Sequence, residues 1–298
     1  MNRSRLLACL GILLLPLLGA PSFAADSACA AFYPTSQAPA VVRPDQAGQP
    51  RELCYGAFAV GHSARMKVPL WAAEHLTRAA LQATLTLERV TAYHPEVLLR
   101  ADDQPGLRDY RFSGKAMGLM ASSFDFPTVA QQVEAFSMAN VVPISPDKAA
   151  GVWRGFDARV RAMAMASGEL YIVTGPMFMS ANGERIRHRV MVPSMLFKAV
   201  YDPASHQAAA YVTGNHAGDD WDYCSIDELT DSIGIDVFPG LPPEVKAHSF
   251  PMPAPIAYVH AEQRLALLSD RQAGSDGTLL AAAGGQIVGR LQLARHSD

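Results

Sequence analysis

Near the middle of the chain, a helix pattern followed at once by a strand pattern constrains the fold more than any other feature. Trp153, Phe156 and Val160 recur at helical spacing and predict a helix with one apolar face at residues 151–165. The next apolar run, ELYIVTGP at residues 169–176, is short and ends in Gly-Pro, which favours a buried strand. A helix face and a strand that must be buried together predict a mixed α+β domain.

Weaker patterns of both kinds extend over residues 51–241 and predict that this region is one domain. It follows an extended lead-in at residues 25–50 and precedes a loosely packed tail, rich in Pro, Ala and Gly, at residues 242–298. Strands are expected at residues 53–62 and 85–94, within 190–201 and at 235–238; helices are expected at 126–138 and, after Ser225, at 226–233, and residues 69–81 are helix-permissive.

The first 24 residues have the pattern of a secretory signal peptide. Arg3 and Arg5 give a basic start, an apolar run follows at residues 6–18, and small residues precede Ala25. The run is too short to span a bilayer, and nothing like it recurs later. We therefore expect a periplasmic or secreted protein that has no membrane span once the signal peptide is removed.

The charge balance gives no broad attraction for nucleic acid. The formal net charge is −3, and removal of a signal peptide that contains Arg3 and Arg5 makes the chain more acidic. With 49% hydrophobic and 18% charged residues, the composition is that of an ordinary globular protein. Any phosphate binding therefore needs a local basic groove, and no run of Lys and Arg guarantees one.

Three cysteines remain after the expected cleavage. Cys29 and Cys54 lie near the start of the mature chain, and a disulfide between them would close a loop of about 25 residues in an oxidising compartment. Cys224 is then left over and is expected to be a buried thiol. No cysteine or histidine spacing indicates a zinc site.

A series of short motifs, in order over about 190 residues, resembles the DNA/RNA non-specific endonuclease family. The resemblance implies a ββα-metal (His-Me finger) nuclease-like fold, with a central antiparallel sheet flanked by helices. The motifs are LCY at 53–55, AEHLT at 73–77, DYRFSG at 109–114, FSMAN at 136–140, GVW at 151–153, RVR at 159–161, YIVTGP at 171–176, VP at 192–193, FK at 197–198 and IDVFPGL at 235–241.

The resemblance also shows which chemical groups have been replaced. In the family, a Ser-Gly pair precedes Asp-Arg-Gly-His, whose histidine is the general base, and a later asparagine holds one divalent ion, usually magnesium. Here Ala116 stands at the aspartate position, Met117 at the arginine position and Leu119 at the general-base position. Ala149 stands at the metal-ligand position. Leucine accepts no proton and alanine offers no oxygen to a hard cation, so no catalytic or metal-binding group is intact.

Other positions of the family site keep polar side chains. Asn140 and Arg161 match substrate-side residues, and Lys115, beside the lost site, is a further candidate for contact with a phosphate. Asp157 stands in for a glutamate that helps to hold metal-bound water, and is the one possible outer-shell residue. These residues are the candidate substrate-binding and metal-side positions.

The expected function is that of a catalytically impaired pseudo-nuclease, a binding module for DNA or RNA or for a protein partner. No cofactor is expected, and Mg²⁺ only if some activity remains. The alternative is an active metal-dependent endonuclease with a rearranged site, in which His75, Asp125 or Asp157 takes over the chemistry. His62 and His94 are expected to be structural, and Cys224 lacks the partners of a nucleophile.

Export gives a first prediction. The mature protein should begin near Ala25 and should carry a disulfide between Cys29 and Cys54. N-terminal sequencing of the protein, together with intact mass before and after alkylation, measures both properties. A mature chain that still contains residues 1–24, or three free thiols in the folded and unreduced protein, contradicts this expectation.

Overall fold

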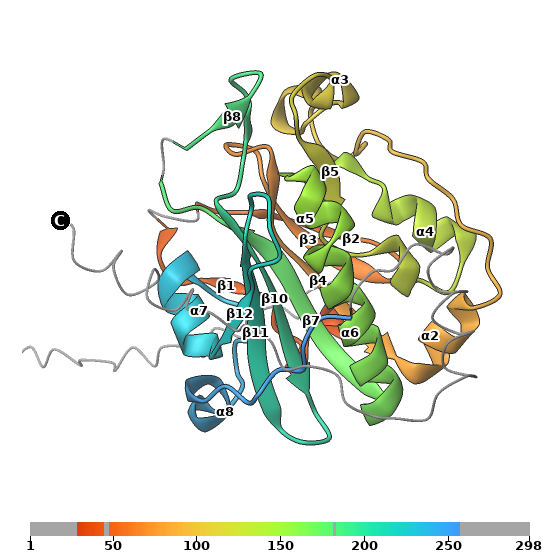
Figure 1. Cartoon of the computed structure of the whole chain (residues 1–298), viewed down its shortest axis with the longest axis vertical. Helices are drawn as coiled ribbons and strands as arrows, with labels where there is room; N and C mark the ends of the chain where they lie inside the picture. Colours follow the sequence, from red (N-terminus) through yellow and green to blue (C-terminus); the bar gives the residue numbers. More distant parts are fainter. Residues whose placement is uncertain (1–28, 45–47, 181–182, 257–298) are drawn as a thin grey trace, which may run out of the picture.

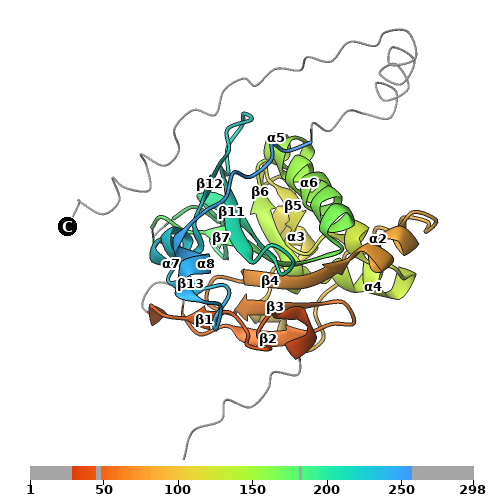
Figure 2. The same ribbon diagram turned by 90° about the horizontal axis from the view of Figure 1, so that it is seen from below.

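A seven-stranded antiparallel sheet forms the centre of the molecule (Figures 1 and 2). The computed structural model describes residues 29–44, 48–180 and 183–256. Neighbouring strands of the sheet, in the order β12-β11-β10-β7-β4-β3-β2, are all antiparallel, as the resemblance implied. The strands are β2 (Arg51–Cys54), β3 (Phe58–Ser63), β4 (Val68–Thr77), β7 (Glu169–Met177), β10 (Met195–Asp202), β11 (Gln207–Gly214) and β12 (Asp222–Cys224).

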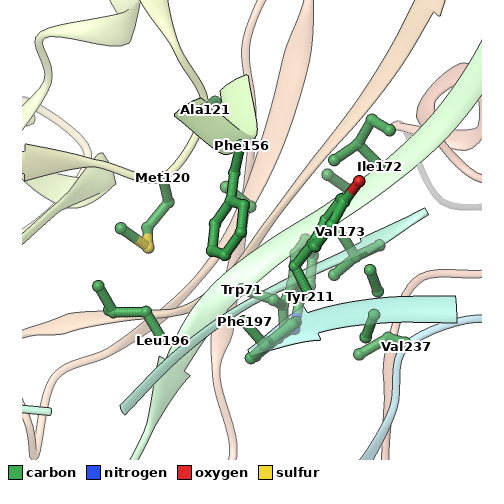
Figure 3. Packing of buried hydrophobic residues seen from close by; sticks show 14 of the residues in the cluster. Trp71, Met120, Ala121, Phe156, Ile172, Val173, Leu196, Phe197, Tyr211 and Val237 are labelled. Carbon is green, nitrogen blue, oxygen red and sulfur yellow. The ribbon is translucent and has the colours of Figure 1, made fainter. Parts of the chain in front are cut away.

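Both faces of the sheet are covered, which explains why its central strands are almost continuously apolar. On one face, Phe156 of α6 stacks on Tyr211 of β11 with ring centroids 4.6 Å apart (Figure 3). On the other face, Tyr201 contacts Phe238, which follows β13. The helices are α2 (Arg78–Thr84), α3 (Leu107–Tyr110), α4 (Val129–Ala135), α5 (Pro146–Ala150), α6 (Val152–Ser167), α7 (Ile226–Ile233) and α8 (Pro243–Ala247).

Three two-stranded pairs complete the fold. β5 (Ala116–Leu119) pairs with β6 (Val141–Ile144), and β8 (Arg185–Ile186) pairs with β9 (Val190–Met191). β1 (Ala40–Val41) pairs with β13 (Ile235–Asp236), so the N-terminal lead-in is joined to the far end of the domain. The 3-10 helices are η1 (Ala30–Phe32), η2 (Ala101–Asp103), η3 (Ser123–Asp125) and η4 (Met138–Asn140).

The elements with the clearest sequence patterns lie where they were expected. α4, α6 and α7 fall in the predicted helical segments, and β7 matches the predicted strand. α7 begins at Ser225, whose hydroxyl accepts from the Glu228 amide while the Glu228 carboxylate accepts from the Ser225 amide. Long periodic segments with capping residues were therefore predicted correctly.

Three shorter predictions were wrong. Residues 53–62 form a hairpin of β2 and β3 and not one strand. Residues 69–81 are mostly strand β4, whose burial on both faces removes the alternation that identifies a strand. Residues 85–94 alternate like a strand but find no partner strand, and form only an isolated bridge between His94 and Ser137.

The cysteines behave as the sequence predicted. Cys29 and Cys54 form a disulfide with their Cα atoms 5.5 Å apart, which ties the lead-in to edge strand β2. Cys224 is a buried free cysteine, and burial raises the pKa of its thiol to about 12. Its thiol therefore stays protonated and unreactive at neutral pH.

The two ends of the chain were expected to be a signal peptide and a loose tail. Residues 1–28 and 257–298 lie outside the described residues, and the expected signal peptide lies in the first of these ranges. Residues 248–256, however, pack on the domain, with the Arg159 side chain donating to the Ala254 carbonyl and Met252 buried. Within the described ranges, no helix has the length and apolar character needed to cross a bilayer.

The close approach of β3 and β4 gives a second prediction. Trp71 lies opposite Gly61, and a Cβ atom added to Gly61 would lie 2.2 Å from the indole ring. Gly61→Ala should therefore lower the free energy of unfolding by roughly 1–3 kcal/mol, the usual cost of overpacking a core. Urea unfolding measures this change.

Gly106→Ala is the matched control, since a Cβ there would meet only an Asp109 oxygen at 3.8 Å. Gly106 is the N-cap of α3, so the control should lose less than about 1 kcal/mol, the usual cost of alanine at that position. If Gly61→Ala and Gly106→Ala have equal stability, the tight packing of Trp71 on β3 is refuted.

Candidate functional site

The candidate site is built on strands β5 and β6, which pair in the register Ala116 to Ile144 and Leu119 to Val141. Gly118 is the residue that allows the two strands to pack this closely. A Cβ atom at Gly118 would lie 2.8 Å from the Ile144 side chain, which is closer than real Cβ contacts come. Glycine persists here for reasons of packing, independent of any chemistry.

Helix α5 and the start of α6 lie against β5. α5 contacts β5, and the indole nitrogen of Trp153 donates to the Leu119 carbonyl at 3.4 Å. Asn215 fixes the start of α5, because its side-chain oxygen accepts from the Ser145 amide at 2.7 Å while its amide group donates to the Pro143 carbonyl. The segment that carries Ala149 is thus held beside the strand that carries Leu119.

The side chains at the four chemistry positions are hydrocarbon or thioether. Ala116, Met117, Leu119 and Ala149 are half-buried and pack against the hydrophobic core. None carries a nitrogen or oxygen atom that can take a proton or hold a hard cation. The four positions that the sequence matched to the family's site therefore carry no group that can act as a base or as a ligand for a hard cation.

Asn140 has a structural role. It is fully buried, and its amide group donates to the carbonyls of Ala121 and Ala135 at 2.9 and 2.8 Å. Its side-chain oxygen accepts from the Ala121 amide at 2.9 Å. Its hydrogen bonds hold the end of β5 to the start of β6, and contact with a substrate, which the family match suggested, stays a prediction.

Asp157 and Arg161, which lie one turn apart on α6, are both engaged in ion pairs. The Asp157 carboxylate lies 3.1 Å from the ammonium of Lys198, which is itself 2% exposed and donates to the Thr174 hydroxyl. Arg161 donates to the buried Asp125 at 2.9 Å. Both side chains therefore hold α6 in place, Asp157 against strand β10 and Arg161 against η3.

Glu74, on β4, adds a third carboxylate to the same interface. It is 1% exposed, and neither of its oxygens has a hydrogen-bond partner among the described residues. Burial raises the pKa of Glu74 well above its ordinary value, and the nearby Asp125 carboxylate raises it further. Lys198 and Arg161 supply two positive charges against three carboxylates, so a proton on Glu74 makes this buried cluster neutral.

Lys115 lies immediately before β5 and is already paired. Its ammonium is 3.3 Å from the carboxylate of Glu184, the residue before β8. The pair ties the base of the β8–β9 hairpin to the start of β5. Contact between Lys115 and a phosphate stays a prediction.

The three histidines named from the sequence, His62, His75 and His94, each contact neighbours that account for their positions. His62 is buried between the carbonyls of Ala139 and Asp103, and burial lowers its pKa, so the ring is neutral. His75 lies 2.7 Å from Glu169 and stacks on Tyr171 with ring centroids 4.2 Å apart. The His94 ring contacts the carbonyls of Pro95 and Val133.

The residues at the family's metal position do not fit a metal ion. Ala149 offers no side-chain oxygen, and the neighbouring Asp157 is paired with Lys198. Within the described ranges, the side chains that lie close enough together to share a metal ion are those of Cys29, Glu52 and Cys54. Its two cysteines are joined in the disulfide and cannot ligate as thiolates.

Comparison with known proteins confirms the fold and the family. The structure superposes on EndoG from a crystal structure of the EndoG/EndoGI complex with a TM-score of 0.60 at 20% identity, over 67% of this chain and 90% of that chain. This likeness confirms the ββα-metal nuclease fold. The sequence model described as DNA/RNA non-specific endonuclease matches residues 37–244, more than half of the chain. The chain belongs to the DNA/RNA non-specific endonuclease family.

Individual relatives are distant. The chain is 24% identical over 177 residues to the mitochondrial nuclease EXOG of Danio rerio. The matched region covers 54% of this chain and 51% of that protein. It is 21% identical over 206 residues to a nuclease of Serratia marcescens, over 64% of this chain and 76% of that protein. The chain spans about half the length of the EXOG relatives that it matches.

Sequence reasoning missed two groups of residues. The first group is Glu74 and Lys198, which both lie within the motifs matched to the family. A glutamate and a lysine in otherwise apolar strands are the signal that could have predicted a buried ion cluster. The segment RIRHR at 185–189 was also passed over, because no continuous run of Lys and Arg was found. Four of its five residues are basic, and the structure places them on one hairpin.

The buried Glu74 gives a third prediction. Its raised pKa means that the folded state binds a proton that the unfolded state releases above about pH 4.3. This contribution to stability is therefore fully present below that pH and is lost as pH rises toward the folded pKa. In the natural protein this loss lowers the free energy of unfolding by up to about 1.4 kcal/mol per pH unit. Glu74→Gln, whose side chain is neutral at every pH, should not show it.

The measurement is urea unfolding of both proteins between pH 4 and pH 8, where the difference between them should grow with pH. Glu244→Gln, at an exposed glutamate on α8, is the control and should give a difference that is constant with pH. A constant difference for Glu74→Gln would show instead that Glu74 is ionised in the folded protein.

Proposed function

We propose that this protein is an exported, non-catalytic member of its family that acts as a binding module. The observation that supports this proposal is the pair of side chains at the chemistry positions, Leu119 on β5 and Ala149 on α5. A general base contributes roughly 10²- to 10⁴-fold to such a reaction. A metal ion contributes several kcal/mol of charge stabilisation. Without both groups, the family reaction has no residue to activate water and none to neutralise the phosphate.

A rearranged active site is less well supported. The residues that would have to take over the chemistry are Asp125, Asp157 and His75. Each is held by an oppositely charged or hydrogen-bonding neighbour, at 2.9, 3.1 and 2.7 Å respectively. A carboxylate that moved to serve a metal would leave a buried cation unpaired, which costs about 3–5 kcal/mol.

Dependence on magnesium is accordingly not part of the proposal. The Lys198 ammonium already supplies the positive charge beside Asp157. A divalent ion would have to displace this ammonium or share its carboxylate, and Ala149 would add no ligand. We propose that the protein functions without a bound metal.

The surface at the start of β5 suits a protein partner better than a phosphate. Ala116, Met117 and Leu119 present half-buried apolar side chains there. Apolar surface gains free energy from contact with other apolar groups and offers a phosphate no hydrogen-bond donor. Nucleic acid, the other candidate ligand, would need a basic surface elsewhere on the domain.

The disulfide supports export. Structural disulfides persist in oxidising compartments and are rare in the cytosol. The Cys29–Cys54 bond follows closely after a sequence with the pattern of a signal peptide. We therefore propose that the protein acts in the periplasm or outside the cell.

A nuclease assay tests the proposed function. Purified mature protein should leave plasmid DNA and RNA intact with magnesium or manganese, in conditions where an active relative degrades both. The combined substitutions Leu119→His, Ala149→Asn, Ala116→Asp and Met117→Arg should produce metal-dependent cleavage, because they return the missing groups to an intact frame. Agarose electrophoresis and release of acid-soluble nucleotides measure both results.

The matched control carries the same changes except that Leu119 becomes Gln, which is polar but is no base. It should stay at least about 10²-fold less active than the variant with histidine. Metal-dependent cleavage by the unmodified protein, lost on Asp125→Asn, Asp157→Asn or His75→Gln and absent from a mock purification, would overturn the proposal.

A further inference from the structure

Helix α3 and strand β8 lie at the same end of the molecule (Figure 1). Arginine-rich residues of the α3 segment and of the β8–β9 hairpin line a pocket there. The pocket is open to solvent and has a volume of about 410 Å³. It lies outside the four chemistry positions. Its lining residues are Arg108, Asp109, Arg111, Phe112 and Arg187.

The β8–β9 hairpin presents one side of this pocket. Arg187 and His188 are the central residues of its turn and both have a positive φ, as in the tight turns that suit hairpins. Both are exposed. Arg187 donates to the Arg111 carbonyl at 3.0 Å, so the hairpin is joined to the loop after α3.

The positive charge of the pocket is not neutralised by its own acid. Asp109 is buried, and its carboxylate accepts a hydrogen bond from the Gly106 amide at 2.8 Å. The same carboxylate forms an ion pair with Arg189 at 2.9 Å. Arg108 and Arg111 are exposed, and over the described ranges no ion pair includes them or Arg187. Three guanidinium groups therefore face solvent together on an otherwise acidic protein.

Phe112 stands among these arginines and has no packing role. Its side chain is 99% exposed, and its backbone has a φ of 56°, a conformation that bulky residues rarely adopt. The core therefore does not explain this phenylalanine. A fully exposed ring beside guanidinium groups is the combination that binds unpaired bases and their phosphates.

We propose that this arginine pocket binds single-stranded nucleic acid, with a base stacked on Phe112 and the backbone phosphates paired with Arg108, Arg111 and Arg187. Guanidinium groups match phosphate geometry with two parallel hydrogen bonds. A base can lie on the Phe112 ring only when it is unstacked from its own neighbours, which favours a single strand over a duplex. The bound strand is held without being cleaved, and in this respect the proposal rests on the proposed non-catalytic function.

The pocket also lies beside the degenerate site. The Lys115–Glu184 pair joins the base of the hairpin to the start of β5. A strand held by Arg108 and Arg111 therefore lies close to β5, where the family reaction would have taken place. Binding and chemistry are carried by different residues, so one can persist after the other is lost.

The test measures fluorescence anisotropy of a labelled fifteen-nucleotide oligothymidylate with the full mature protein, in EDTA and over a range of salt concentrations. Arg108→Ala combined with Arg111→Ala should weaken binding and reduce the salt slope by about 1.4, or about 0.7 for each phosphate contact with a single strand. Both side chains are exposed and make no hydrogen bond or ion pair within the described ranges, so these changes leave the fold intact.

Phe112→Ala should weaken binding about 5- to 150-fold, the loss expected for one stacked base. It should leave binding of an abasic oligonucleotide unchanged, and Phe112→Trp should keep the affinity for oligothymidylate. Arg78→Ala combined with Arg159→Ala removes the same number of charges from α2 and α6. These two side chains donate to the carbonyls of Met165, Ala166 and Ala254, so urea unfolding must first show that the control is folded. The folded control should bind within about twofold of the natural protein, apart from a small loss of long-range attraction.

Equal binding by the pocket variant and the Arg78/Arg159 control would overturn the proposal. The proposal is also overturned if the pocket variants lose binding to polyglutamate but keep binding to oligothymidylate. That result would show that the pocket binds an acidic protein. If the protein cleaves DNA with magnesium while the pocket variants still lose binding in EDTA, the proposed function is refuted and the pocket proposal stands. An inert protein that binds no oligonucleotide would refute the pocket and leave the proposed function standing.

Discussion

The packing of α6 onto the central sheet is the constraint on which the rest of the structure depends. Phe156 brings apolar surface to this interface, while Asp157 and Arg161 bring charges that must be matched away from water. Removal of one partner from a buried pair leaves an unpaired charge and costs about 3–5 kcal/mol. The charged side chains of α6 therefore position the helix, and through Trp153 they also set how α5 and α6 meet β5.

This arrangement explains how the fold accommodates apolar side chains at Leu119 and Ala149. The strand pair is held by the glycine at 118, which leaves room for Ile144, and by the buried amide of Asn140. Leu119 and Ala149 contribute to the frame through their backbones and through modest apolar contact. At such positions the described contacts of the fold require no polar side chain.

The sequence predicts the parts of this protein whose signals are local. The amphipathic spacing of α6, the Ser225 cap of α7 and the two cysteines near the start of the chain each determine their structure directly. β4 was missed because a strand buried on both faces has no alternation, and residues 85–94 alternate but have no partner to pair with.

The candidate site was predictable only in its frame. The ordered motifs assigned Leu119 and Ala149 to the positions of the base and the metal ligand, and the structure brings β5 and α5, which carry them, into contact. The assignment itself stays a prediction. The ion pairs of Asp157 and Arg161 were not predictable, because their partners lie 41 and 36 positions away on other elements. The arginine pocket is non-local in the same way: it forms where residues 108–112 and the hairpin at 185–191 meet.

The described C-terminal segment reaches beyond the part of the chain that the family shares, which ends at residue 244. It runs back across the domain, where Pro253 accepts from the Tyr211 hydroxyl at 2.6 Å and the Ile256 amide donates to the Gly155 carbonyl at 3.1 Å. A Cβ atom at Gly155 would lie 2.9 Å from the Ile256 carbonyl oxygen, so the two backbones are in direct contact. The outer side of α6 is therefore already occupied there by the protein's own chain. A partner that approached the helix at this point would first have to lift that segment away.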